Sequence, residues 1–123
     1  MTVAGVGIDA VEIDRFRKVL ARTPGVARRL FTDAERAYGE RAKDPAPRLA
    51  ARFAAKEATM KALGVGLGAF KFHEVEVVKA PSGAPSLRLT GAAADLASTN
   101  RVTTFHLSIS HTDQTAEAVV VAE

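Results

Sequence analysis

The chain has 123 residues, 47% hydrophobic and 25% charged, so it can build the core of one globular domain spanning residues 1–123. It contains no cysteine, which excludes disulfides, thiolate chemistry and zinc–sulfur sites and suits the cytoplasm. The net charge of +3 favours an anionic partner, while the N-terminus lacks a signal-peptide pattern and no apolar run reaches the roughly 20 residues that span a membrane.

The N-terminal part is predicted to form a buried strand followed by an amphipathic helix. The apolar residues 3–8 favour the strand, which we expect to end at Asp9. Apolar residues at helical spacing predict a helix over residues 12–22. Asp9 and Glu12 have the spacing of a helix N-cap and its acidic third residue, so a helix cap is one interpretation of Asp9. The apolar residues with helical spacing are Ile13, Phe16 and Leu20.

A second helix is predicted over residues 33–41, because Thr32 and Glu35 form a capping-box pattern. Before it, Thr23-Pro24-Gly25 breaks the first helix, and residues 26–31 form a short apolar piece without a predicted helix.

Residues 48–64 are predicted to form a long central helix. Strong helix formers fill it, Pro47 precedes it and Gly64 is suited to end it. An apolar stripe and an arc of alanine cover most of its circumference, so we expect it to be largely buried. A chain of this length has limited means to cover such a helix alone, and the alanine arc would suit close contact with its own chain or a neighbour.

Charged residues occupy only the margins of this helix. Arg48, Arg52 and Lys56 lie on one side of the apolar stripe, and Glu57 and Lys61 lie on the other. Charges at the margins of a buried helix need partners or a metal. Glu57 and Lys61 also have the i,i+4 spacing of a surface ion pair worth about 0.2–0.5 kcal/mol, so both interpretations stay open.

The second half of the chain is predicted to contain strands and one helix. The glycine-rich residues 64–68 follow a helix, whereas a dinucleotide fingerprint needs a preceding strand, so we reject that interpretation. The predicted strands are residues 72–79, 86–90, 104–110 and 116–122, with a loop at residues 81–85, a helix over residues 91–99 and a turn at residues 111–114. The order β-α-α-α-β-β-α-β-β predicts an α+β domain with a mainly antiparallel sheet packed against the long central helix.

Several familiar catalytic arrangements are absent or unfavourable. The chain has no P-loop motif. Ser110 and His111 are adjacent on a predicted strand and would point to opposite faces, which argues against a hydrolase triad. The three histidines have no helical metal-ligand spacing.

Two carboxylates are better candidates for chemistry. If the first strand packs beside the central helix, Asp9 and Glu57 could share a hard cation. Mg²⁺ characteristically binds through one or two carboxylates plus substrate phosphates, and Lys61 would add positive charge one helical turn from Glu57.

Four segments resemble, in order, motifs of the holo-acyl-carrier-protein synthases, the small type of 4′-phosphopantetheinyl transferase. Gly5–Arg15 resembles the opening motif of that family and Arg52–Gly64 resembles its second motif. Phe31–Glu35 and Ser108–Thr112 match in the same order, so the resemblance runs nearly from end to end.

The resemblance implies transfer of 4′-phosphopantetheine from coenzyme A to a serine of an apo acyl carrier protein, with release of adenosine 3′,5′-bisphosphate. It implies that Asp9 and Glu57 bind Mg²⁺ together with the pyrophosphate and that the serine attacks the β-phosphoryl group. Lys61 would stabilise charge on the phosphate oxygens, so the implied catalytic residues are Asp9, Glu57 and Lys61. Glu57 and a metal-bound water both remain candidates for taking the serine proton.

The resemblance also implies a homotrimer with active sites between subunits. His111 and the loop of residues 81–85 would approach a nucleotide held largely by the neighbouring chain. The residues expected to contact coenzyme A are Lys61, Gly64, Gly83, Pro85, His111 and Thr112.

A basic stripe on the first helix has two interpretations. Arg15, Lys18 and Arg22 lie within about 60° of one another, which by itself suits a solvated surface. The resemblance implies that they dock the acidic carrier protein. Arg52 and Lys56 point away from Glu57 and could contact the carrier or form a structural ion pair.

The competing class is a basic nucleic-acid-binding module. It would explain the positive charge but not the carboxylates, because buried acids repel phosphate in the absence of a metal. We therefore expect neither a nucleic acid nor a membrane as partner. The sequence does not distinguish fatty-acid from polyketide carriers.

Overall fold

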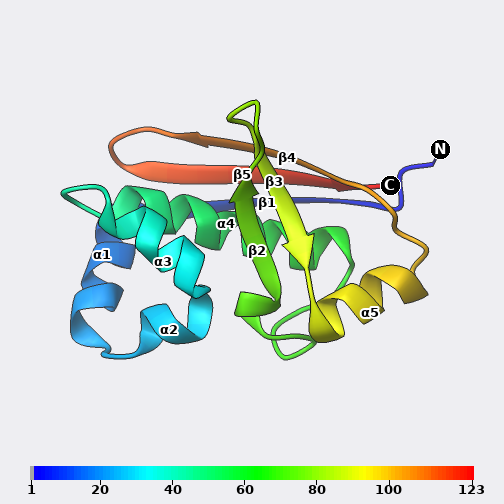
Figure 1. Ribbon diagram of the computed structural model, residues 1–123, viewed down its shortest axis with the longest axis horizontal. Helices are drawn as coiled ribbons and strands as arrows, with labels where there is room; N and C mark the ends of the chain where they lie inside the picture. Colours follow the sequence, from blue (N-terminus) through cyan, green and yellow to red (C-terminus); the bar gives the residue numbers. More distant parts are fainter. Residues whose placement is uncertain (1) are drawn as a thin grey trace.

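The long helix α4 (Ala46–Ala62) lies against one face of a three-stranded antiparallel sheet in the computed structural model, which describes residues 2–123 (Figure 1). The sheet contains β1 (Gly5–Glu12), β5 (Thr115–Ala122) and β4 (Phe105–His111), with β5 between the other two. The expected α+β fold, with antiparallel strands packed against a central helix, is confirmed.

A second antiparallel sheet and the remaining helices pack around the rest of α4. Strands β2 (Val75–Lys79) and β3 (Pro85–Leu89) pair with each other, and β2 contacts α4. The helices α1 and α3 also contact α4, and Figure 1 shows α1, α2 and α3 grouped at one end of the molecule and α5 at the other. Their bounds are α1 Ile13–Arg22, α2 Val26–Leu30, α3 Asp33–Glu40, α5 Gly91–Thr99 and the short 3₁₀ helix η1 Phe72–Glu74.

Small residues let β1 and α4 approach each other closely. A Cβ atom at Gly5 would overlap the carbonyl oxygen of Ala62, and one at Gly7 would overlap that of Ala58. Ala58 is fully buried against the sheet, as the alanine arc predicts. This close approach fixes the position of β1 relative to the side chains on α4.

One expectation about α4 is wrong. We expected that a chain of this length could hardly cover the helix alone, yet most of α4 is buried within the single chain. The reason is that the large sheet, strand β2 of the second sheet and the helices α1 and α3 all contact α4. Exposed apolar side chains do gather on the outer face of the large sheet, at Val6 (59% exposed), Ile8 (60%) and Val119 (36%).

The structure also corrects the predicted start of the chain. The first strand continues to Glu12, so Asp9 lies within β1 and does not cap α1. Pairing explains the difference, since the antiparallel ladder with β5 extends to the pair of Glu12 with Thr115. Asp9 is thereby held by the ladder through its backbone, and its side chain takes no part in capping α1.

Other element bounds shift for local reasons. Residues 26–30 form the helix α2, which the sequence did not predict, and the predicted strand 72–79 begins with the turn of η1. The central helix begins at Ala46, because the Asp44 side chain accepts a hydrogen bond from its N–H (3.2 Å). The capping box of Thr32 and Glu35 is confirmed. None of the helices within residues 2–123 is long and apolar enough to cross a membrane.

Candidate functional site

Asp9 and Glu57 line the same groove, although they come from β1 and α4. The groove has a volume of about 600 Å³ and runs between these elements and the helices α1 and α2. The predicted packing of the first strand beside the central helix is therefore present. It brings together two carboxylates that are 48 residues apart in the sequence (57 − 9).

Lys61 joins the two elements beside the carboxylates. Its Nζ donates to the carbonyl oxygen of Ile8 (2.8 Å) and lies 3.2 Å from Oδ1 of Asp9. Lys61 thus pairs with β1, a partner that the sequence analysis did not name, and not with Glu57 in a surface i,i+4 pair. Its side chain is about half exposed, so the ammonium group is also accessible to a ligand.

The electrostatics of Glu57 fit a cation site. Burial raises the pKa of the Glu57 carboxyl above its ordinary value, the negative charge of Asp9 raises it further, and Lys61 opposes the rise. Two carboxylates that repel each other in a partly buried groove provide oxygen ligands of the kind that Mg²⁺ prefers. A divalent cation would relieve this repulsion, so Asp9 and Glu57 fit the predicted metal.

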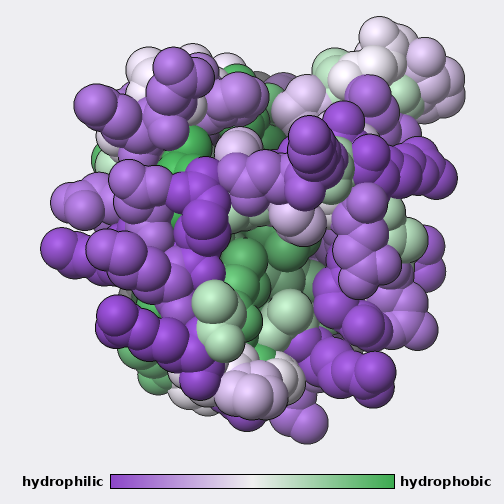
Figure 2. Space-filling model, turned by 90° about the vertical axis from the view of Figure 1, so that its left-hand side faces the viewer, coloured by the Kyte–Doolittle hydropathy of each residue, from purple (hydrophilic) through white to green (hydrophobic). Residues whose placement is uncertain are grey.

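Aromatic side chains form one wall of the groove. The rings of Phe16 and Phe53 stack at 5.3 Å between centroids, and those of Phe53 and Phe72 stack at 5.4 Å. All three rings line the groove that contains Asp9 and Glu57. Figure 2 views the end of the molecule that carries α1 and α2, and it shows an apolar area framed by hydrophilic side chains. The groove therefore has an acidic end and an aromatic wall.

A second hollow of about 200 Å³ lies between α4 and the edge strand β4. Three basic side chains, Arg48, Arg52 and Lys79, line it around Tyr38, together with His111. The hollow also contains Gly83 and Pro85, so three of the residues predicted to contact coenzyme A lie together here.

Arg52 is the most buried cation of this hollow. Its guanidinium lies 3.9 Å from the Tyr38 ring centroid, and burial lowers its pKa. Its Nε is buried without a hydrogen-bond partner. Sequence reasoning left Arg52 undecided and missed Tyr38 and Lys79. The only local signal is that Arg48 and Arg52 are one helical turn apart.

The remaining predicted contacts lie outside the groove and the second hollow. Gly64 follows α4 in a left-handed conformation (φ 72°) and lies beside Lys61 in a third hollow, of about 450 Å³, at the end of that helix. Thr112 follows His111, and its side chain accepts hydrogen bonds from the N–H groups of Gln114 and Thr115 (both 3.1 Å). The predicted coenzyme contacts therefore form two groups in one chain.

The predicted metal ligands and the residues of the second hollow lie on opposite sides of α4. Asp9 and Glu57 face the β1 edge of the large sheet, whereas Arg52 and His111 face its β4 edge. The central strand β5 separates the two edges. A single chain therefore does not place the predicted metal ligands and His111 in one pocket.

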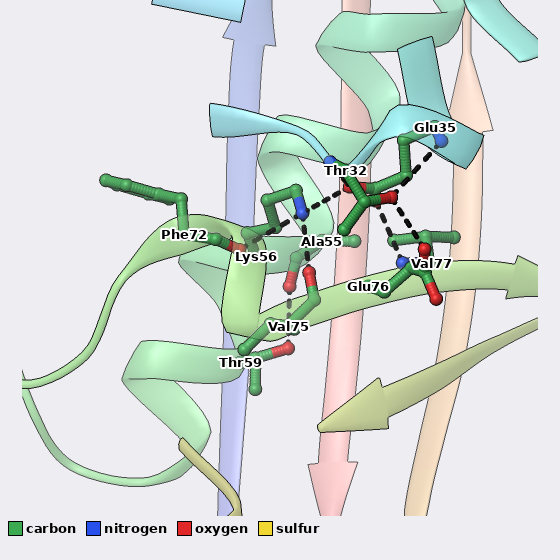
Figure 3. A network of polar contacts seen from close by, with 9 residues as sticks. All are labelled: Thr32, Glu35, Ala55, Lys56, Thr59, Phe72, Val75, Glu76 and Val77. Carbon is green, nitrogen blue, oxygen red and sulfur yellow. Dashed lines mark hydrogen bonds and ion pairs between the residues drawn. The ribbon is translucent and has the colours of Figure 1, made fainter. Parts of the chain in front are cut away.

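Lys56 has a structural partner, which answers a question that the sequence left open. Its Nζ lies 2.7 Å from Oε1 of Glu35, and both side chains are buried (Figure 3). Burial lowers the pKa of Lys56, and the charge of Glu35 opposes that change. Lys56 is thus buried and paired, and it belongs to no exposed surface.

The basic stripe has the exposure that its predicted role requires. Arg15, Lys18 and Arg22 are exposed on α1, and Arg15 lies 3.7 Å from Glu12. Arg15 also lines the aromatic groove, so the stripe and the groove form one continuous surface.

Comparisons with known proteins agree with this geometry. Residues 5–120 match the model of the 4′-phosphopantetheinyl transferase superfamily. A holo-[acyl-carrier-protein] synthase of Frankia alni is 50% identical over 123 residues, which cover 100% of this chain and 99% of the relative. One from Streptomyces avermitilis is 49% identical with the same coverage.

Solved structures are similar over the same length. The Neisseria meningitidis holo-[acyl-carrier-protein] synthase has a TM-score of 0.89 at 32% identity, with 99% of each chain covered. The Bacillus anthracis enzyme in complex with CoA (3′,5′-ADP) has a TM-score of 0.82 at 34% identity, covering 99% of this chain and 97% of the other. The Helicobacter pylori enzyme in complex with coenzyme A has a TM-score of 0.83 at 32% identity, covering 96% and 99%.

Proposed function

Because the chain belongs to the 4′-phosphopantetheinyl transferase superfamily, we propose that it transfers 4′-phosphopantetheine from coenzyme A to a serine of an apo acyl carrier protein. Similar structures contain coenzyme A, which supports coenzyme A as the donor. The observation that carries the proposal is the cluster of Asp9, Glu57 and Lys61 at the acidic end of the groove.

Asp9 and Glu57 would hold Mg²⁺ together with the pyrophosphate of coenzyme A. When bound, the metal would offset the negative charge of the two carboxylates and of the pyrophosphate, and it would stabilise the negative charge that develops on the phosphate during transfer. Lys61 already lies 3.2 Å from Asp9, and its accessible ammonium group would donate to a phosphate oxygen.

The reaction is a displacement at the β-phosphorus. The oxygen of the carrier serine forms a bond to this phosphorus, the bond to the bridging oxygen breaks, and adenosine 3′,5′-bisphosphate leaves. The serine proton must be accepted, and the Glu57 carboxylate lies in the groove where the serine would enter. Glu57 and a water molecule in the site are both candidates to take the proton.

The hollow beside β4 would bind the nucleotide end of coenzyme A. Arg48, Arg52 and Lys79 supply positive charge for phosphate, and Arg52 has an unpaired buried N–H. Gly83, Pro85 and His111 line the same hollow, and Thr112 follows directly. Lys61 and Gly64 would contact the pyrophosphate at the end of α4.

We assign the surface of α1 to the carrier protein. Its exposed basic stripe complements an acidic partner, and the stripe is continuous with the groove that leads to Glu57. The carrier would thus place its serine at the acidic end while apolar side chains near that serine pack in the groove.

A homotrimer would complete the site. The metal ligands and the nucleotide hollow lie on opposite sides of α4, so a neighbouring chain is needed to bring them together. The exposed apolar face of Val6, Ile8 and Val119 is a suitable surface for such contact. The number three rests on the family resemblance.

Mass spectrometry tests the function directly. A bacterial apo acyl carrier protein is incubated with coenzyme A, Mg²⁺ and the purified protein, and the carrier is then weighed. We expect a gain of one phosphopantetheine on the serine, no gain on a carrier whose serine is replaced by alanine, and loss of the reaction with EDTA. An unmodified carrier in the complete mixture would contradict the proposal and leave a non-catalytic binding module as the alternative.

A further inference from the structure

The edge of β2 that does not pair with β3 faces the helices α3 and α4. Strand β2 pairs with β3 in the sheet to which it belongs, so its other edge presents polar backbone groups. Two side chains satisfy these groups. Lys56 Nζ donates to the carbonyl of Val75 (2.5 Å), and Oε2 of Glu35 accepts from the N–H of Val77 (2.9 Å).

The same pair also binds the short helix η1. Lys56 Nζ donates to the carbonyl of Phe72 (3.1 Å) as well as to Oε1 of Glu35 (2.7 Å), and Figure 3 shows the ammonium group between these acceptors. Lys56 is 0% exposed and Glu35 is 1% exposed. The single ammonium group therefore joins α3, η1 and β2 from within α4.

Stability alone is a weak reason for such an arrangement. Removing two charges from water costs several kcal/mol per ion, and well-packed apolar residues often replace a buried pair without loss. Hydrogen bonds from Lys56, however, have fixed directions that apolar contacts lack. The pair consequently specifies where the backbone of Phe72 lies.

The position of Phe72 matters because its ring forms part of the groove wall. It stacks on Phe53 at 5.4 Å and lines the groove with Glu57. The chain that leads to Phe72 contains Gly64, Gly66 and Gly68, which have open space around them, and it regains core contact only at the buried Phe70. Lys56 is thus the anchor that α4 supplies at the end of this glycine-rich link.

We propose that Lys56, held by Glu35, is a positioning residue that fixes Phe72 as a wall of the groove for the carrier protein. This inference rests on the proposed function. Lys56 acts through Phe72 and touches neither substrate, whereas the phosphates of coenzyme A meet Asp9, Glu57 and Lys61. Loss of this anchor should therefore weaken binding of the carrier protein and leave binding of coenzyme A nearly unchanged.

The test compares Lys56→Met with the wild-type protein. The Kd for a fluorescently labelled apo carrier protein is measured without coenzyme A, and transfer kinetics are measured for both substrates. We expect the Kd and the KM for the carrier to rise about tenfold, which corresponds to about 1.4 kcal/mol. The KM for coenzyme A should change less than about twofold. A control, Leu96→Ala, removes apolar volume packed against the core on α5, outside the groove, and should change neither KM.

A double-mutant cycle separates positioning from general loss of structure. In a Phe72→Ala background the ring is already absent, so Lys56→Met should have little further effect on the carrier Kd. If Lys56→Met does not fold, the apolar pair Glu35→Leu with Lys56→Met replaces it, because it removes the hydrogen bonds of Lys56 without leaving the charge of Glu35 unpaired. Glu35→Leu alone then serves as its reference, since it removes the bonds that Glu35 accepts from Thr32 and Val77.

Three results would overturn the inference. The first is an unchanged Kd for the carrier in a folded variant. The second is an equal rise in the KM for the carrier and the KM for coenzyme A. The third is additive effects of Lys56→Met and Phe72→Ala on the carrier Kd. The wild-type arm reports separately on the proposed function. Carrier binding without transfer would refute the function, while the cycle would still decide whether Lys56 acts through Phe72.

Discussion

At the scale of single residues, Glu57 carries a charge that the fold itself disfavours. Its pKa is raised by burial and by Asp9, so the folded protein binds its proton more tightly than the unfolded chain does. The contribution of Glu57 to stability is therefore complete below its unfolded pKa and is lost as the pH rises through the folded value. A residue that costs stability at neutral pH is a candidate for a role outside folding, and its place in the groove beside Asp9 agrees with that.

Asp9→Asn and Glu57→Gln should abolish transfer while the fold remains. Each change removes a proposed metal ligand, and we expect a loss above the roughly 10–100-fold that follows removal of an outer-shell partner. Glu57→Gln should also leave the stability of the metal-free protein unchanged or raised at pH 7, because an unfavourable charge is gone. Transfer assays and urea denaturation measure both effects. Near-normal transfer by either folded variant would refute the metal assignment.

Arg15→Glu should act on the carrier and not on coenzyme A. Exposed charges mainly set the encounter rate and its salt dependence, so the KM for the carrier should rise several-fold and vary less with salt. The KM for coenzyme A should stay constant. Arg41→Glu, at an exposed residue after α3, is the matched control and should behave as wild type. Weakened coenzyme A binding with normal carrier kinetics would mean that α1 does not dock the carrier.

At the scale of elements, the distance between β1 and α4 determines the site. Gly7→Ala places a Cβ against the carbonyl of Ala58, and we expect a loss of about 1–3 kcal/mol of stability. Transfer should fall as well, since Asp9 lies two residues further along the displaced strand. Gly66→Ala is the control, because a Cβ there meets nothing within 4 Å. Urea denaturation and transfer assays of both variants check the prediction, and equal behaviour of the two would contradict it.

The junction between η1 and α5 provides a pH-dependent element. Glu74 accepts hydrogen bonds from the N–H groups of Lys71 (2.7 Å) and Ala92 (2.8 Å), and these bonds, that of Lys71 first, lower its pKa below the ordinary 4.5. Its contribution to stability is thus present above pH 4.5 and lost as the pH falls through the lowered folded value.

Glu74→Gln should therefore destabilise the protein at pH 7 by about 1 kcal/mol, as loss of a helix cap does. The difference in the free energy of unfolding between Glu74→Gln and wild type should narrow as the pH falls below 4.5. The carboxylate is then protonated first in the unfolded chain and, at lower pH, in the folded protein. Urea denaturation at several pH values measures it, with Glu40→Gln at an exposed residue as control. A difference that is constant with pH would show that the two backbone bonds do not depend on the charge.

At the scale of the whole molecule, assembly decides whether the site is complete. The exposed valine and isoleucine side chains of β1 pair across the sheet with those of β5, as Ile8 does with Val119. They form an apolar face opposite to the one that packs on α4. Such a face favours contact with another copy of the chain.

We predict a homotrimer in which each site takes residues from two chains. Light scattering should give the mass of three chains. If His111→Ala is itself strongly impaired, co-expression of His111→Ala with Glu57→Gln should restore part of the activity, because some mixed trimers contain an intact site. A fully active monomer would exclude the assembly. A trimer without complementation would place each site within one chain.

Local patterns were sufficient to predict most elements and part of the site. The capping box at Thr32, the helix Gly91–Thr99 and the buried alternation of Val75 and Val77 depend on neighbours a few residues away. Asp9, Glu57 and Lys61 were identified as candidates from residue type, spacing and family resemblance. Asp9 and Glu57 lie in one groove, with Lys61 paired to Asp9, because the first strand packs against the central helix, as the sequence analysis supposed.

Local sequence patterns thus specify the order of the elements and the chemical groups that they carry. Which of these groups meet depends on how the elements pack in three dimensions. Glu35 and Lys56 are 21 residues apart and form a buried pair, and Tyr38 stacks with Arg52 in a hollow that β4 completes. The physical reason is that periodicity reports which face of an element is apolar, whereas a partner for a buried charge is selected by packing between distant segments.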